Sequence, residues 1–195
     1  MFKTLPIKLS YLCMLSMGMV LISPAQVAIA QASPTAPAAA DIARPVPASR
    51  IHEVSLLKGK LAFTLTGYVK QADPKRADVT RYFGPADKRF VGTSERSLAK
   101  MGAGGKAVDL KQAAEIIKQE QKSEYPDYRA RSETQGKYKG LDMIRIDAFD
   151  NANGYNVINT NLLIQDRGQL AVVQVISANR QKLEHEAWVQ KILGK

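Results

Sequence analysis

Residues 141–177, LDMIRIDAFDNANGYNVINTNLLIQDRGQLAVVQVIS, decide the fold of this chain. Apolar and β-branched residues fill 141–149, 155–165 and 169–177, and turn-forming residues separate these segments at 150–154 and 166–168. A further extended segment is expected at 128–134, with a turn at 138–140. Connections this short force neighbouring strands to run antiparallel. The sequence therefore predicts a four-stranded antiparallel meander.

Apolar side chains occur on both sides of the central strand of this meander. One side carries Val157, Asn159 and Asn161, and the other carries Ile158, Thr160 and Leu162. Burial on both sides indicates that helices cover both faces of the sheet.

Two segments have the apolar spacing of helices that lie on a sheet. The first begins after its N-cap Asp109, continues to about residue 123 and ends before Pro126. One of its faces is expected to be exposed to solvent. The second covers 180–193, with Asn179 as a plausible cap and Trp188 on its apolar face.

Two hairpins are expected before the first helix. Residues 54–57 and 60–65 flank Lys58 and Gly59, and residues 78–83 and 88–95 flank the turn 84–87. The glycine-rich segment 101–106 is expected to be a mobile loop. The element order predicts an α+β fold, an antiparallel β-sheet flanked by α-helices.

The N-terminal region has the sequence pattern of an export signal. Basic residues precede an apolar stretch at 9–22, and Ala28-Ile29-Ala30 fits a cleavage site, so residues 1–30 are expected to be a signal peptide cleaved after Ala30. An uncleaved anchor is the alternative. Residues 31–50 are an Ala/Pro-rich linker, and residues 51–195 form one domain.

Composition limits the partners of that domain. Without the signal peptide, the chain has 26 basic residues and 18 acidic ones, a net charge of +8. In the periplasm this charge favours an envelope protein or an anionic membrane surface. The two signs are interspersed along the chain, so nucleic acid is not expected as a partner. Nothing in the sequence fixes the oligomeric state.

Three segments give the chain a family resemblance: LLKGKLAFTL at 56–65, QEQ at 119–121 and WVQKIL at 188–193. Together with the strand pattern over residues 52–194, they resemble the DcrB family of envelope proteins. The resemblance implies a PsbP-like α/β/α sandwich and a non-enzymatic role linked to envelope integrity or phage adsorption. DcrB-type proteins are often lipoproteins, whereas the only cysteine here, Cys13, lies inside the apolar stretch, so soluble periplasmic residence is expected.

No motif indicates a catalytic, cofactor or metal site. His52 and His185 lie far apart in sequence, outside any ligand-spacing motif, and the helical position of His185 favours a place at the edge of the core. The glycines of 102–106 lack the spacing of a phosphate-binding loop. No catalytic residue, no cofactor and no metal ion is therefore expected.

Pairs of acidic residues support the one enzymatic alternative, an envelope hydrolase with dispersed acidic catalytic residues. Glu184 with Glu186, and Asp147 with Asp150, are candidates for acid/base chemistry only if a cleft shifts their pKa values. We interpret them as solvated charges.

Aromatic and basic side chains at turns and strand ends form the candidate partner-binding set: Tyr125, Tyr128, Arg129, Tyr138 and Lys139. Tyrosine and arginine are enriched at binding surfaces. The alternative is that these tyrosines only pack on the sheet beside the first helix.

Overall fold

The computed structural model describes residues 50–73, 76–152 and 154–195. The chain divides into two units, Met1–Ala43 and Arg44–Lys195, and all described residues belong to the second. The predicted signal peptide at 1–30 and all of the predicted linker at 31–50 except Arg50 lie outside the described residues.

The main sheet has seven antiparallel strands in the order β3-β4-β5-β9-β8-β7-β6. Its strands are β3 (Val69–Ala72), β4 (Val79–Gly84), β5 (Arg89–Ser97), β6 (Arg129–Tyr138), β7 (Leu141–Ala152), β8 (Tyr155–Asp166) and β9 (Gln169–Ala178). Strands β6 to β9 are the predicted meander, and β5 joins it by pairing with β9. A separate two-stranded sheet contains β1 (Ile51–Leu56) and β2 (Leu61–Thr66).

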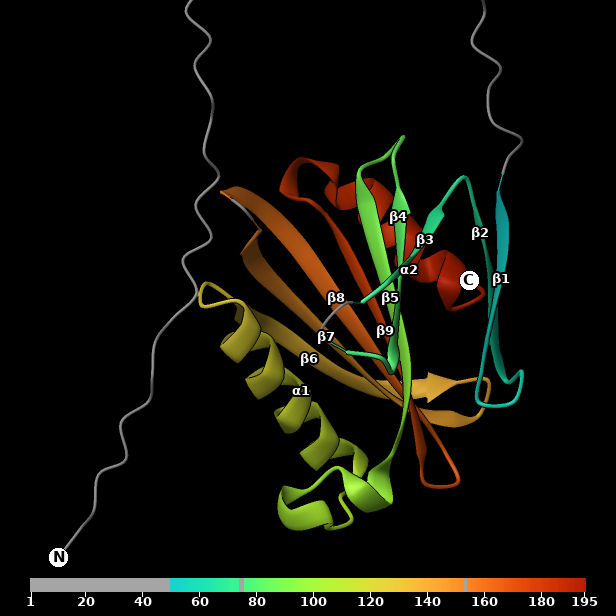
Figure 1. The fold of residues 1–195 in the computed structure, drawn as a ribbon, viewed down its shortest axis with the longest axis vertical. Coiled ribbons are helices and arrows are strands. Elements are labelled where there is room, and N and C mark those ends of the chain that lie inside the picture. The colour runs from blue at the N-terminus through green and yellow to red at the C-terminus, as the bar shows by residue number, and fades with distance from the viewer. Residues whose placement is uncertain (1–49, 74–75, 153) are drawn as a thin grey trace, which may run out of the picture. The chain divides into compact units, whose positions relative to one another are not determined.

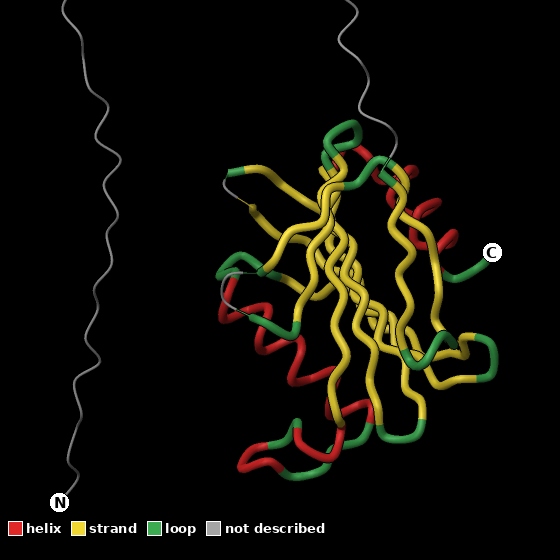
Figure 2. The backbone as a smooth tube through the Cα atoms, turned by 45° about the vertical axis from the view of Figure 1, so that its right-hand side comes forward, coloured by secondary structure: helices red, strands yellow, loops and turns green. Residues whose placement is uncertain are grey.

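The main sheet is the middle of three layers. Helix α1 (Leu110–Glu124) lies on one face, and helix α2 (Lys182–Ile192) lies on the other together with the β1–β2 hairpin (Figure 1). The strands cross one another obliquely, as a twisted sheet does (Figure 2). The predicted α+β fold with an antiparallel sheet flanked by helices is confirmed.

Alternation along the strands produces two separate cores. In β8, Leu163 points to the α1 core while Leu162 and Ile164 point to the α2 core. The α1 core also contains Ala113 and Ile117 of the helix. Both faces of β8 are thus buried, as its apolar residues on both sides predicted.

Helix α1 begins at a capping box. The Asp109 side chain accepts a hydrogen bond from the Gln112 backbone N–H, and the Gln112 side chain accepts one from the Asp109 backbone N–H. Each side chain satisfies a backbone donor that the first helical turn leaves without a partner. The predicted start of this helix is confirmed.

The structure departs from the sequence prediction at several places. Strand β6 continues to Tyr138, beyond the predicted end at 134, and strand β7 continues to Ala152, into the predicted turn 150–154. Strand β3, only four residues long, was not predicted. A 3₁₀ turn at Ala103–Gly105 lies within 101–106, the segment expected to be a mobile loop, and another at Leu98–Lys100 precedes that segment. Asn179 is not the cap of α2, because a 3₁₀ turn at Asn179–Gln181 precedes the helix and moves the N-cap to Gln181.

Within the described part of the chain, no helix combines the length and the apolar character that crossing a membrane requires.

Candidate functional site

The five predicted partner-binding residues do not form one surface. Tyr125, Tyr128 and Arg129 lie at the start of β6, whereas Tyr138 and Lys139 lie at its far end. The strand has 10 residues, so roughly 30 Å of extended backbone separates the two groups.

Two of the three predicted tyrosines are buried. Tyr128 is 5% exposed and Tyr138 is 3% exposed, and burial raises the pKa of Tyr128 to about 12. Tyr138 belongs to the core on the α2 face of the sheet, so the alternative that these tyrosines pack beside the first helix is wrong for Tyr138. Arg129 and Lys139 are exposed, so a binding role for these two cations stays a prediction.

A groove runs between the first turn of α2 and the adjacent ends of β6, β7 and β8. We call it the α2 groove; it has a volume of about 320 Å³. Its walls are formed by Arg131, Ser132, Arg145, Asp147, Ala148, Phe149, Ile158, Lys182, Leu183, His185 and Glu186. No local sequence pattern indicates this groove, because its walls come from four elements that the topology brings together.

Two large apolar side chains at the α2 groove are exposed to solvent. Leu183 is 83% exposed and Phe149 is 37% exposed. The Arg131 guanidinium lies 5.2 Å from the centre of the Phe149 ring, a cation–π distance. The groove therefore presents apolar and basic groups side by side.

Both acidic side chains of the groove wall are paired with the same arginine. The Arg145 guanidinium donates to Asp147 at 2.9 Å and binds both oxygens of Glu186. This contact lowers the pKa of Glu186 to about 2. Both carboxylates are thus committed to Arg145, and Glu186 stays ionised at neutral pH.

Beneath the groove, a buried chain of hydrogen bonds passes through His185. Arg89 Nε donates to Ser177 Oγ at 2.9 Å, and Ser177 Oγ lies 3.0 Å from His185 Nδ1. On the other side, His185 Nε2 lies 2.8 Å from Thr160 Oγ1, which donates to Asp147 at 2.7 Å. We call this chain the His185 relay.

The ends of the relay fix the tautomer of His185. The guanidinium at one end only donates, and the ionised carboxylate at the other end only accepts. Each hydroxyl between them must therefore donate its proton toward the Asp147 end of the relay. Ser177 then donates to Nδ1, and Nε2 carries the proton that His185 donates to Thr160. Burial and the nearby Arg89 charge lower the pKa of His185 to about 4, which keeps the ring neutral. His185 is only 2% exposed, so it is fully buried, whereas the sequence predicted a place at the edge of the core.

The acidic pairs proposed for a hydrolase do not converge. Asp147 faces α2, whereas Asp150 faces α1 from the other side of the sheet, since β7 side chains alternate. Glu184 is exposed, while Glu186 is held by Arg145. The interpretation of these acids as solvated charges was wrong for Asp150, which is 5% exposed and whose pKa burial raises.

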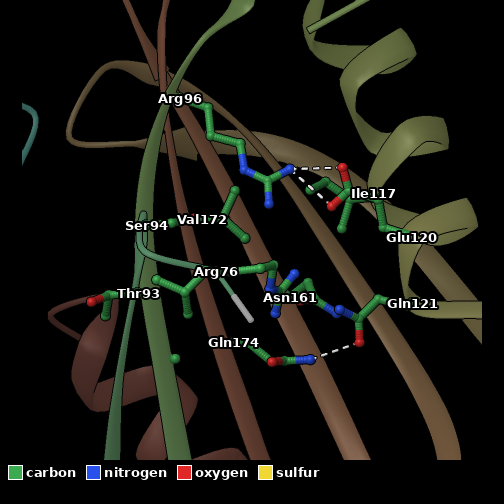
Figure 3. Close-up of a pocket in the computed structure, with 12 residues that line it drawn as sticks. Arg76, Thr93, Ser94, Arg96, Ile117, Glu120, Gln121, Asn161, Val172 and Gln174 are labelled. Atoms are coloured by element: carbon green, nitrogen blue, oxygen red, sulfur yellow. Dashed lines mark hydrogen bonds and ion pairs between the residues drawn. The ribbon is translucent and has the colours of Figure 1, made fainter. Parts of the chain in front are cut away.

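A second hollow lies under α1, and it is polar and very small. Gln121, Asn161 and Gln174 are among the residues that line it, and Gln121 Oε1 accepts a hydrogen bond from Gln174 at 2.8 Å. Figure 3 shows Gln174 and Gln121 joined across the hollow, with Arg96 reaching Glu120 above them. Its volume of about 20 Å³ suits a single water molecule rather than a ligand.

Metal-binding side chains do not gather anywhere in the described residues: no group of three or more His, Cys, Asp or Glu side chains could hold a metal ion.

Comparison with known proteins identifies the fold. No protein-family model matches the chain, and no curated protein matches it. Among solved structures, the cyanobacterial PsbP protein CyanoP from Synechocystis sp. PCC 6803 is similar, with a TM-score of 0.53, 10% identity, and coverage of 77% of this chain and 94% of CyanoP. The chain thus has a PsbP-like fold.

Two further solved structures are more distant. LpqN of Mycobacterium tuberculosis, described as involved in cell envelope biogenesis, has a TM-score of 0.43 at 11% identity. The match covers 76% of this chain and 82% of LpqN. The Ran-binding protein Mog1p of Saccharomyces cerevisiae has a TM-score of 0.45 at 12% identity. The match covers 71% of this chain and 85% of Mog1p.

Proposed function

We propose that this protein is an exported, non-enzymatic envelope protein of DcrB type. In this proposal residues 1–30 direct export and are removed, and the mature domain is soluble in the periplasm. The domain binds an anionic partner there, either an envelope protein or the membrane surface, and so supports envelope integrity or phage adsorption. The leader pattern and the +8 charge of the chain without it support this assignment, and the PsbP-like fold accords with it.

The α2 groove is the single observation that carries the binding role. It places an 83% exposed leucine, Leu183, and a 37% exposed phenylalanine, Phe149, on one surface. Large apolar side chains gathered on an otherwise polar surface are typical of interaction sites. Together with the adjacent basic residues, they suit a partner that has both apolar and anionic groups.

The acids at the groove support binding rather than acid/base catalysis. A general acid or base works best when its pKa lies near the working pH. Arg145 holds the pKa of Glu186 at about 2, far below that range. Asp147 accepts hydrogen bonds from both Arg145 and Thr160.

Cell fractionation and partner capture test this proposal. We expect the protein in the periplasmic fraction, with a mature N-terminus at Gln31 in the mass spectrum. Crosslinking in intact cells, followed by mass spectrometry, should then recover an envelope component attached near the groove. Retention in the cytosol with an intact leader, or an absence of any envelope crosslink or vesicle binding, would contradict the proposal.

A further inference from the structure

The α2 groove carries basic side chains that form no ion pair with the acidic residues that the structure describes. Arg131 and Lys182 belong to its walls, and Arg129 pairs in register with Phe149 beside it. Among the described residues, none of these three cations forms an ion pair, unlike Arg145. Arg145 offsets only one of the two acids Asp147 and Glu186. With the three cations above, the groove therefore has four positive charges against two negative ones, a net charge of +2.

The exposed apolar side chains lie beside these cations at the α2 groove. Leu183 follows Lys182 in the first turn of α2, and the Phe149 ring lies against the Arg131 guanidinium. Ile158 is 8% exposed and pairs with Phe149 in the neighbouring strand. An occupant must therefore offer hydrocarbon to Leu183 and Phe149, and an anion to the cations beside them.

We propose that the α2 groove is a docking site for anionic phospholipid at a bilayer surface. The phosphate groups contact Arg129, Arg131 and Lys182, while Leu183 and Phe149 enter the boundary between head groups and acyl chains. Peripheral membrane proteins combine a few inserted apolar side chains with flanking cations in this way. This inference rests on the proposed binding function and names its partner.

Charge complementarity favours lipid over a nucleic acid or a neutral apolar ligand. A nucleic acid offers phosphates but no hydrocarbon for the 83% exposed Leu183. A neutral ligand leaves three cations at the rim without a partner. Each basic residue close to an anionic bilayer contributes about 1 kcal/mol, which is about fivefold in affinity per charge.

Vesicle sedimentation of the intact mature protein provides the test. Vesicles contain phosphatidylglycerol and phosphatidylcholine in equal amounts, and pure phosphatidylcholine vesicles serve as the uncharged reference. We expect binding to the anionic vesicles only, weakening as salt is raised, because screening reduces the attraction. Arg131→Gln with Lys182→Gln should lower the affinity more than tenfold, and Leu183→Ser should lower it severalfold.

Matched control variants separate the groove from the general positive charge. Lys111→Gln with Lys122→Gln removes two exposed cations from α1, on the opposite face of the sheet, and Ile51→Ser removes a 62% exposed apolar side chain far from the groove in sequence. These controls should bind like the wild type. All substituted positions are on the surface, and circular dichroism with thermal melting confirms that each variant is folded.

The outcomes distinguish this inference from the proposed function. An equal loss in the α1 controls would overturn the groove as the site, since binding would then follow net charge. No vesicle binding, with an envelope protein crosslinked at Leu183, would overturn the lipid and leave the proposed function standing. No vesicle binding and no envelope crosslink would overturn both.

Discussion

At the residue scale, His185 makes the stability of the domain depend on pH. Its pKa falls from 6.5 to about 4 on folding, so between these values the unfolded chain takes up a proton that the folded chain does not. The free energy of unfolding therefore decreases as the pH falls from 6.5 to about 4, by about 3 kcal/mol from this residue. Above pH 6.5 this contribution is constant.

Urea titrations followed by the fluorescence of Trp188, the only tryptophan, measure this effect. His185→Gln removes the titrating ring, so its stability should change less between pH 6.5 and 4 than that of the wild type. The charged groups around the ring, Arg89, Arg145, Asp147 and Glu186, remain in both proteins. Asp150, whose raised pKa acts in the opposite direction, is also common to both. Equal slopes would show that His185 is not the responsible group.

Arg89 is a second residue whose removal should be costly. Its side chain is 2% exposed; it donates to Ser177 and Asp87 and lies 5.4 Å from the Trp188 ring centre. Arg89→Ala leaves Ser177 and Asp87 without this donor and opens a cavity, so we expect a loss of about 3 kcal/mol or more in unfolding free energy. Chemical denaturation measures it. Arg167→Ala, at a side chain 76% exposed, should change stability by less than about 0.5 kcal/mol.

At the scale of elements, the capping box of α1 should contribute measurably. Asp109→Ala removes the acceptor for the Gln112 backbone N–H, bound at 2.7 Å, and should lower the unfolding free energy by about 1 kcal/mol. Thermal melting measures this loss. Asp109→Asn keeps a capping oxygen and should recover most of it, whereas equal losses in both variants would indicate a charge effect instead.

Elements encoded by local patterns were predictable from the sequence. The meander, both hairpins and α1 follow from alternation, turn residues and capping, which act within a few residues. Strand β3 was missed because its four residues, VKQA, carry little apolar signal. Its existence depends on pairing with β4, which no local pattern reports.

The candidate site was far less predictable than the elements. Arg145 lies 41 residues from Glu186, and Thr160 lies 25 residues from His185, so neither contact has a sequence signature. Of the predicted binding residues, Arg129 lies beside the α2 groove because it pairs with Phe149. Tyr128 and Tyr138 instead pack inside, because tyrosine suits a half-apolar interior as well as an interface.

At the scale of the whole molecule, β6 is an open edge of the main sheet. Among the strands of the described residues it pairs with β7 alone, and nine of its ten residues are exposed. A register shift between Ala130 and Ser132 and several charged side chains interrupt this edge, as natural sheets do to prevent pairing between molecules. Gln135→Val with Lys137→Val should therefore increase self-association in sedimentation velocity. Lys137→Glu keeps a charge and should sediment like the wild type.

The pairing of β5 with β9 has a consequence for how the chain folds. Strands β6 to β9 close through short turns, whereas Ser97 meets Gln169 only after 71 intervening residues have been brought together. Closing so large a loop costs on the order of 4 kcal/mol of chain entropy, so the meander should assemble first and β5 should dock late. In stopped-flow experiments Ile146→Val in β7 should then slow refolding, while Val91→Ala in β5 should chiefly accelerate unfolding.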